Sequence, residues 1–269
     1  MNDIIYNQNS ILIVIILFVA MLIAIESGYR LGVKSKKLAN PSYKSHIESV
    51  QSSLLGILAL LIAFTFSIAL QRFDSRSEAV VDEANSIGTA FLRAQLLPIA
   101  VRQDVQKALH QYIDIRVQSS TLPLDHTNDH LALRTNANDI LNSLWQLAIQ
   151  ATEIDPNPVT TGLFIQSLNE LIDSFGRRTA TVDRHVPEAV LMLLSIVFIA
   201  TGCVVGYSVG ITNNRPSNMS YLMVGLIVLL VFIIIDLDHP RRGLIRVSQN
   251  SLTDLKASIH KDYRQALTK

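Results

Sequence analysis

Two arginines directly follow a long apolar run, and their spacing suits the handling of charged groups at a membrane edge. The run 54–70 carries no charge, and Arg72 and Arg76 come just after it. A spacing of four residues places both side chains on one face of a helix. Such guanidiniums can attract anions to a pore mouth, or they can pair with Asp74, Glu78 or lipid phosphates. The sequence leaves both interpretations open.

A second polar cluster, formed by Asp236, Asp238 and His239, closes the last apolar run. Carboxylate oxygens can hold calcium or magnesium, but two carboxylates and one imidazole make a thin ligand set. Acidic groups are unfavourably placed at a helix C-terminus, so we expect them to have specific partners. The better interpretation is pairing with one of the arginines that follow, Arg241, Arg242 and Arg246. We therefore predict no metal site.

Catalytic chemistry has little support in the sequence. We find no phosphate-binding loop, no GxSxG and no HExxH. The polar region contains four scattered histidines, His110, His126, His130 and His185. Isolated histidines on helices are usually surface or packed residues. Cys203 is the single cysteine, which excludes an intrachain disulfide and a cysteine-based zinc site. We predict that the protein is not an enzyme and needs no cofactor.

The composition places these residues in a membrane protein. The chain has 269 residues, 49% of them hydrophobic, and a mean hydropathy of +0.32. The apolar residues concentrate in four runs, each about as long as a bilayer core is thick: 10–29, 52–70, 188–211 and 221–237. No basic residue precedes the first run, so we interpret it as a retained span rather than a signal peptide. The net charge of +1 does not suggest a nucleic-acid partner.

Residues 71–187, between the second and third spans, form the only sizeable polar region. Apolar side chains recur there every three or four residues in four sets, which predicts four amphipathic helices. Pro98, Pro123 and the segment 155–158 separate these sets. The tail 240–269 is basic and amphipathic, and it can lie on anionic lipid. Four spans put both termini and the region 71–187 on one side of the membrane. The number of basic residues near the spans favours the cytoplasm for that side, whereas the density of basic residues in the two opposite loops favours the outside. We predict the cytoplasm.

Small residues recur at helical spacing in two of the spans, which favours close approach of neighbouring helices. In the third span they are Gly202, Gly206 and Gly210. In the second span they are Gly56, Ala59, Ala63 and Ser67.

A different face of the second span carries Ile62 and Phe66. If several copies of the chain surround an axis, these side chains can form an apolar constriction that gates by dewetting. The alternative interpretation is that they face lipid or neighbouring helices.

The second span and the helix after it resemble the corresponding stretch of bestrophins. The matching residues are Gly56, Ala63-Phe64, Arg72-Phe73 and Arg76. Most of the chain more closely resembles an uncharacterised bacterial membrane family labelled bestrophin-like. That family carries stretches similar to 64–67, 72–73, 81–89, 236–240 and 243–245. Within the last three, the motif positions are Asp82, Glu83, Asn85, Gly88, Asp236, Asp238, Pro240 and Gly243.

The resemblance implies a fold and an activity. Bestrophins are pentameric anion channels with four spans per subunit, cytosolic termini and a helical cytosolic region. The chain is therefore expected to be an all-α, homo-oligomeric channel in the lipid bilayer of the bacterial inner membrane, pentameric if the resemblance holds. The Trp-Trp pair that follows the bestrophin arginine is absent, since Phe73-Asp74 stands there, and the acidic calcium clasp has no counterpart. A non-conducting sensor or scaffold, which binds a partner through its helical domain, is the alternative.

Overall fold

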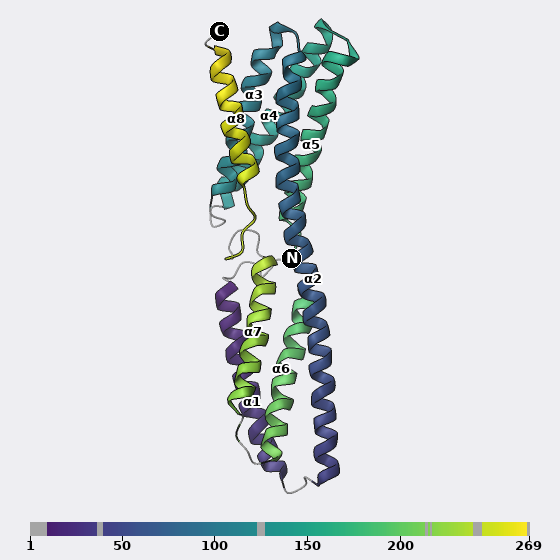
Figure 1. The fold of residues 1–269 in the computed structure, drawn as a ribbon, viewed down its shortest axis with the longest axis vertical. Helices are drawn as coiled ribbons and strands as arrows, with labels where there is room; N and C mark the ends of the chain where they lie inside the picture. The colour runs from purple at the N-terminus through teal and green to yellow at the C-terminus, as the bar shows by residue number, and fades with distance from the viewer. Residues whose placement is uncertain are drawn as a thin grey trace. The chain divides into compact units, whose positions relative to one another are not determined.

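The computed structural model describes residues 10–36, 40–122, 127–212, 215, 217–238 and 244–267, and every regular element among them is helical (Figure 1). The α-helices are α1 (Ser10–Ser35), α2 (Pro41–Arg93), α3 (Ile99–Thr121), α4 (Thr127–Ile154), α5 (Leu163–Val182), α6 (Glu188–Ile211), α7 (Asn218–Asp238) and α8 (Asn250–Leu267). Two short helical turns, η2 (Ala94–Leu96) and η3 (Pro158–Gly162), stand before α3 and α5. The all-α fold class predicted from the sequence is confirmed.

The chain divides into two compact units. Unit 1 comprises Met1–Phe73 and His185–Ile245, and unit 2 comprises Asp74–Arg184 and Arg246–Lys269. Helix α2 belongs to both, since its residues up to Phe73 lie in unit 1 and the rest in unit 2. Within the described residues, four helices are long and apolar enough to cross a membrane, namely α1, α2, α6 and α7. The four predicted spans fall on these four helices.

The connection between the first two spans is short, because both helices extend into the polar sequence 30–51 that separates the predicted spans 10–29 and 52–70. Helix α1 continues to Ser35, and α2 begins at Pro41. Proline is well suited to a first helical position because its missing N–H would have no partner there. The Asn40 side chain accepts a 2.7 Å hydrogen bond from the Tyr43 N–H, as helix-capping residues do. Hydropathy marks the part of a helix that suits lipid and not the ends of the helix.

Helices α1 and α6 approach each other backbone to backbone in unit 1. A Cβ atom added to Gly206 of α6 would lie 2.0 Å from the carbonyl oxygen of Ile25, and one added to Gly28 of α1 would lie 2.0 Å from that of Cys203. The close packing predicted for the glycines of the third span is confirmed. The partner helix supplies glycines of its own, which the sequence analysis did not recognise.

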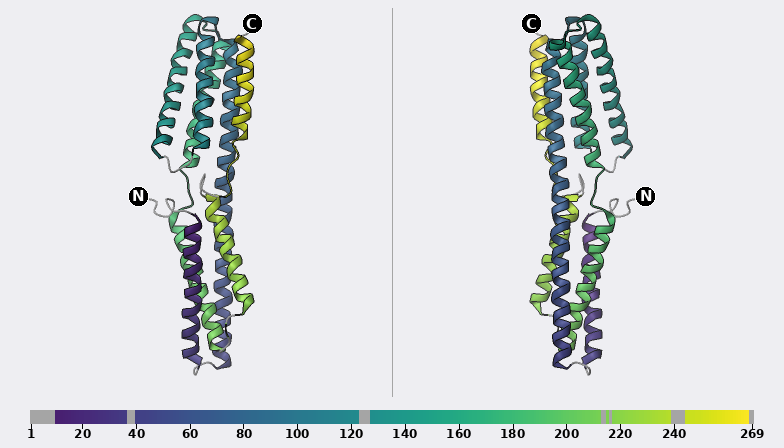
Figure 2. Two further views of the ribbon diagram at one scale, coloured as in Figure 1. Left: turned by 90° about the vertical axis from the view of Figure 1, so that its left-hand side faces the viewer. Right: turned by 90° about the vertical axis from the view of Figure 1, so that its right-hand side faces the viewer.

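Unit 2 packs α3, α4, α5, α8 and the second part of α2 around an apolar core. Its largest fully buried side chains include Ile87, Leu109, Tyr112, Leu144, Phe164 and Leu168. Helix α8 lies beside α2 in both views of Figure 2, and its Leu252 and Ile259 are buried in the same core. Unit 2 therefore covers Leu252 and Ile259 of the tail, so these two apolar side chains are not available to lipid.

Candidate functional site on helix α2

The apolar part of α2 has one buried side and one exposed side within a single chain. On the buried side, Leu58 and Thr65 are each 1% exposed. On the opposite side, Leu60 is 56% exposed and Phe64 is 61% exposed. Gly56 also lies on the exposed side, where an added Cβ would meet no atom within 4 Å. Unit 1 thus leaves a complete face of α2 uncovered.

The four small residues predicted to form a packing face all lie on this uncovered side. They are Gly56, Ala59, Ala63 and Ser67. A glycine inside a helix costs about 1 kcal/mol relative to alanine, and Gly56 gains no contact from its own chain that would offset this cost. A close approach of another molecule to Gly56 would offset this cost.

The two candidate constriction residues have a different environment. Ile62 is only 8% exposed and belongs to the core of unit 1, and Phe66 is half-buried against that core. Both side chains therefore contact their own chain. A constriction formed between copies of the chain needs side chains that a single copy leaves exposed, and on this helix Leu60 and Phe64 meet that condition.

The two arginines that follow the apolar run have different surroundings. Arg72 is half-buried in unit 1, whereas Arg76 is 4% exposed in unit 2. The Arg76 guanidinium donates to the carbonyl oxygen of Thr181 at 3.3 Å and to that of Arg184 at 2.8 Å. The Thr181 carbonyl lies in the last turn of α5, where C=O groups lack partners within the helix and attract cations, and the Arg184 carbonyl lies just past the end of that helix. Arg76 therefore holds α2 to the end of α5.

The motif residue Glu83 is the centre of a buried ionic cluster in unit 2. Its side chain has no exposed surface, and its carboxylate accepts hydrogen bonds from Arg116 Nε at 2.6 Å, Arg116 Nη2 at 3.1 Å and the Tyr112 hydroxyl at 2.8 Å. Arg178 Nη1 donates to the same carboxylate, and Arg178 Nη2 donates to the Gln249 side chain at 2.9 Å. The cluster joins α2, α3 and α5 to the segment that precedes α8.

The charges in this cluster stabilise one another. Burial by itself would raise the pKa of the Glu83 carboxyl, but the guanidiniums of Arg116 and Arg178 hold that pKa below its usual range. Burial and the neighbouring Glu83 carboxylate raise the pKa of Tyr112 well above its ordinary value. Glu83 is therefore ionised and Tyr112 is neutral at physiological pH. The arrangement satisfies buried charges and offers no nucleophile, which fits a structural role.

Glu83 was predicted as a motif residue, but its partners Tyr112, Arg116 and Arg178 were not predicted. One signal was present, because Glu83 follows Val80 by three residues and precedes Ile87 by four, which places a carboxylate in the middle of the apolar stripe of α2. An acidic residue in that position needs a buried cation. The other motif residues of this stretch have separate environments. Asp82 and Asn85 are exposed, and a Cβ on Gly88 would meet Leu255 of α8 at 3.3 Å.

The acidic pair at the end of α7 binds backbone amides. Asp236 is 2% exposed and accepts the N–H groups of Leu244 at 2.9 Å and Ile245 at 2.8 Å. Asp238 is 1% exposed and accepts the Val186 N–H at 3.0 and 3.2 Å. These two carboxylates fasten the segments before α6 and after α7 to the end of α7, an arrangement that we did not predict. The motif positions Pro240 and Gly243, with His239, Arg241 and Arg242, lie outside the described residues.

Comparisons with known proteins identify a family and a fold. A family model described as Bestrophin-like domain matches residues 35–252. Among solved structures, one mutant form of a bacterial bestrophin homologue from Klebsiella pneumoniae is 15% identical, with a TM-score of 0.62 over 93% of this chain and 98% of that one. A second mutant form of the homologue is 14% identical, with a TM-score of 0.62 over 94% and 96% of the two chains. None of the curated proteins matches the chain significantly.

Proposed function

This chain belongs to the Bestrophin-like domain family, and from that membership we propose that it forms a homo-oligomeric ion channel in the bacterial inner membrane. The termini and residues 71–187 lie in the cytoplasm in this proposal, as the resemblance to bestrophins implies. That resemblance favours five copies. The observation that carries the proposal is the uncovered face of α2, which a single chain leaves without packing partners.

The uncovered face has the properties of a helix that surrounds a shared axis. Its small residues allow neighbouring copies of α2 to approach closely. Leu60 and Phe64 are one turn apart on this face and would point toward the axis from every copy. Rings of such apolar side chains make a narrow passage that opens and closes by wetting and dewetting. Leu60 and Phe64 therefore replace Ile62 and Phe66 as the proposed constriction.

The charges beyond the apolar part of α2 bear on which ions pass. In unit 2 the exposed residues of α2 include Asp74, Glu78 and Asp82. Rings of carboxylates around a pore favour cations over anions. The resemblance to bestrophins instead implies anions. We propose that cations pass more readily, because these three exposed side chains belong to the helix that would line the pore.

The first prediction concerns conduction itself. Purified protein reconstituted in a planar bilayer should carry current. Under a salt gradient, the voltage at which this current reverses should shift toward the equilibrium potential of the cation. The mass in detergent should correspond to several copies. A reversal toward the anion would refute the proposed selectivity while leaving the channel in place. Absence of current in every salt, together with a monomeric mass, would refute the channel and favour the sensor or scaffold.

The second prediction locates the constriction. Replacing Phe64 or Leu60 with alanine should raise the open probability or the conductance, since a wider and less apolar ring dewets less readily. Two matched variants serve as controls. Leu226→Ala removes a leucine of α7 that is 55% exposed, about as much as Leu60. Ile62→Ala removes a side chain from the buried face of α2. Both controls should conduct as the parent does. If Ile62→Ala alone changes the current, the constriction lies on the other face of α2.

A further inference from the structure

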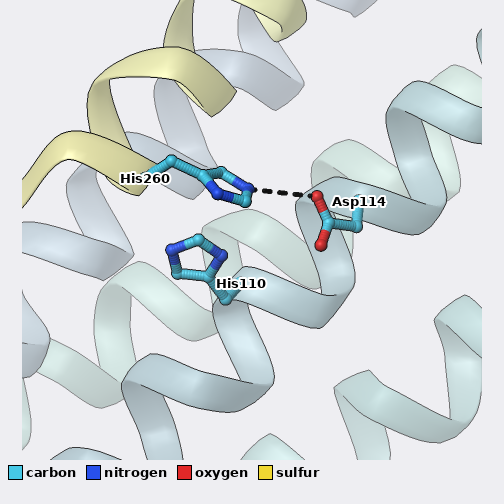
Figure 3. Close-up of side chains that lie close together, drawn as sticks. All are labelled: His110, Asp114 and His260. Carbon is cyan, nitrogen blue, oxygen red and sulfur yellow. Dashed lines mark hydrogen bonds and ion pairs between the residues drawn. The ribbon is translucent and has the colours of Figure 1, made fainter. Parts of the chain in front are cut away.

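A cluster of two imidazoles and one carboxylate joins α3 to α8 in unit 2 (Figure 3). His110 and Asp114 are four residues apart on α3, so both side chains lie on the same face of the helix. His260 approaches them from α8, and its Nε2 lies 3.3 Å from Asp114 Oδ1. One potential ligand atom of each residue lies within 4.8 Å of the other two. Among the residues that the structure describes, no other three side chains of these types lie this close together.

We propose that His110, Asp114 and His260 form a site for a divalent transition-metal ion of the zinc type, which fastens α8 to α3. The proposal stands apart from the channel function, because it concerns only residues of unit 2. It also revises our prediction that the chain has no metal site, which weighed the residues at the end of α7 and the single cysteine but did not bring His110, Asp114 and His260 together.

The distances suit a small tetrahedral ion. Two ligands that lie 2.0–2.2 Å from a tetrahedral zinc ion are about 3.3–3.6 Å apart. The 3.3 Å between His260 Nε2 and Asp114 Oδ1 already falls in that range. The imidazoles of His110 and His260 meet edge to face, with ring centroids 4.2 Å apart. The three ligand atoms lie within 4.8 Å of one another, so a bound ion would have to draw them closer together.

The surroundings meet the other needs of such a site. His110 is buried, whereas the side chains of His260 and Asp114 are 37% and 44% exposed. One side is thus open to solvent, which gives a route of entry and room for a water molecule as the fourth ligand.

The ligand set also selects the class of ion. Imidazole nitrogen suits zinc, copper, nickel and iron, whereas calcium and magnesium take oxygen ligands. With a single carboxylate, this cluster offers little to calcium. One cation already competes for the carboxylate, since the Lys256 ammonium lies 2.8 Å from the same Asp114 Oδ1. A bound metal would have to displace Lys256 or use the other carboxylate oxygen.

The test uses the full-length protein, purified in detergent and stripped of metal with a chelator. Co²⁺ added to it should produce the visible absorption bands of a tetrahedral site, with one ion per chain. Zn²⁺ should displace Co²⁺ and raise the thermal unfolding midpoint, whereas Ca²⁺ should do neither. In His260→Ala, Zn²⁺ affinity should fall by more than the roughly 10–100-fold seen when only a hydrogen-bond partner of a ligand is removed. His110→Ala should have the same effect if the variant folds.

Two further variants sharpen the result. His46→Ala removes an exposed histidine from the start of α2 and should leave metal binding unchanged. Lys256→Met should tighten Zn²⁺ binding, because it removes the ammonium that competes for Asp114. The proposal is overturned if Co²⁺ gives no bands, if Ca²⁺ stabilises the protein as well as Zn²⁺, or if His260→Ala and His46→Ala bind Zn²⁺ equally.

Discussion

Replacing Glu83 with alanine is expected to destabilise unit 2 by about 3–5 kcal/mol, the usual cost of removing one partner from a buried ion pair. The substitution destabilises unit 2 because it leaves two guanidiniums buried without their carboxylate. Arg116 and Arg178 are 6% and 3% exposed, and both donate to the Glu83 carboxylate. Without that carboxylate, two like charges stay buried next to each other. A loss of this size is a large part of the total stability of a typical protein, about 5–15 kcal/mol.

The chain provides its own probe for this measurement. Trp145 is the single tryptophan, and it packs against the core of unit 2. Its fluorescence during denaturant titration in detergent should report a lower midpoint for Glu83→Ala. Asp82→Ala is the matched control, since it removes the neighbouring exposed carboxylate and should change stability by no more than about 0.5 kcal/mol.

A double substitution separates lost charge pairing from lost packing. Adding Arg178→Met to Glu83→Ala removes one of the unpaired buried charges, so the double variant should be more stable than Glu83→Ala alone. If the two substitutions simply add, or if Glu83→Ala is no worse than Asp82→Ala, the cluster does not contribute in the way its geometry indicates.

The second large effect is expected for Gly206→Ala, which adds one carbon atom to unit 1. That atom would lie 2.0 Å from the carbonyl oxygen of Ile25, and the nearby atoms belong to the backbone, so no side-chain rotation can relieve the clash. Helices α1 and α6 would have to separate along their contact. We expect a loss of at least the roughly 1–3 kcal/mol typical of overpacking, seen as a lower thermal midpoint and less monodisperse protein in detergent.

The same substitution elsewhere should have the opposite sign. A Cβ on Gly225 of α7 would meet nothing within 4 Å. Gly225→Ala should therefore stabilise the helix, by up to about 1 kcal/mol. Equal effects at Gly206 and Gly225 would show that the α1–α6 contact is looser than its geometry indicates.

The sequence predicted which parts of this protein are helical and which of them suit lipid. Long apolar runs and apolar residues at helical spacing are local signals, and both depend only on neighbouring residues. Close packing at Gly206 could be predicted for the same reason. The extensions of α1 to Ser35 and of α2 back to Pro41 were missed, because a helix that leaves the lipid continues in polar sequence without a change that hydropathy detects.

Contacts between distant residues could not be predicted. Glu83 binds Arg116 and Arg178, which are 33 and 95 residues away in the chain. Which face of α2 is exposed could also not be predicted from the sequence. In a span, the side toward lipid and the side toward neighbouring helices are both apolar, so periodicity does not distinguish Ile62 from Leu60. Only the packing of unit 1 distinguishes these two side chains.

The division of unit 2 into two segments has a consequence for the order in which the newly made protein can fold. Glu83 and Arg178 leave the ribosome within the first segment, Asp74–Arg184, whereas Gln249 and α8 come with the second, Arg246–Lys269. Between these segments the chain must insert α6 and α7 into the bilayer. Until then Leu252 and Ile259 cannot pack into the core, and Arg178 cannot donate its hydrogen bond to the Gln249 side chain. The helical unit therefore reaches its final packing only after the last span has been synthesised.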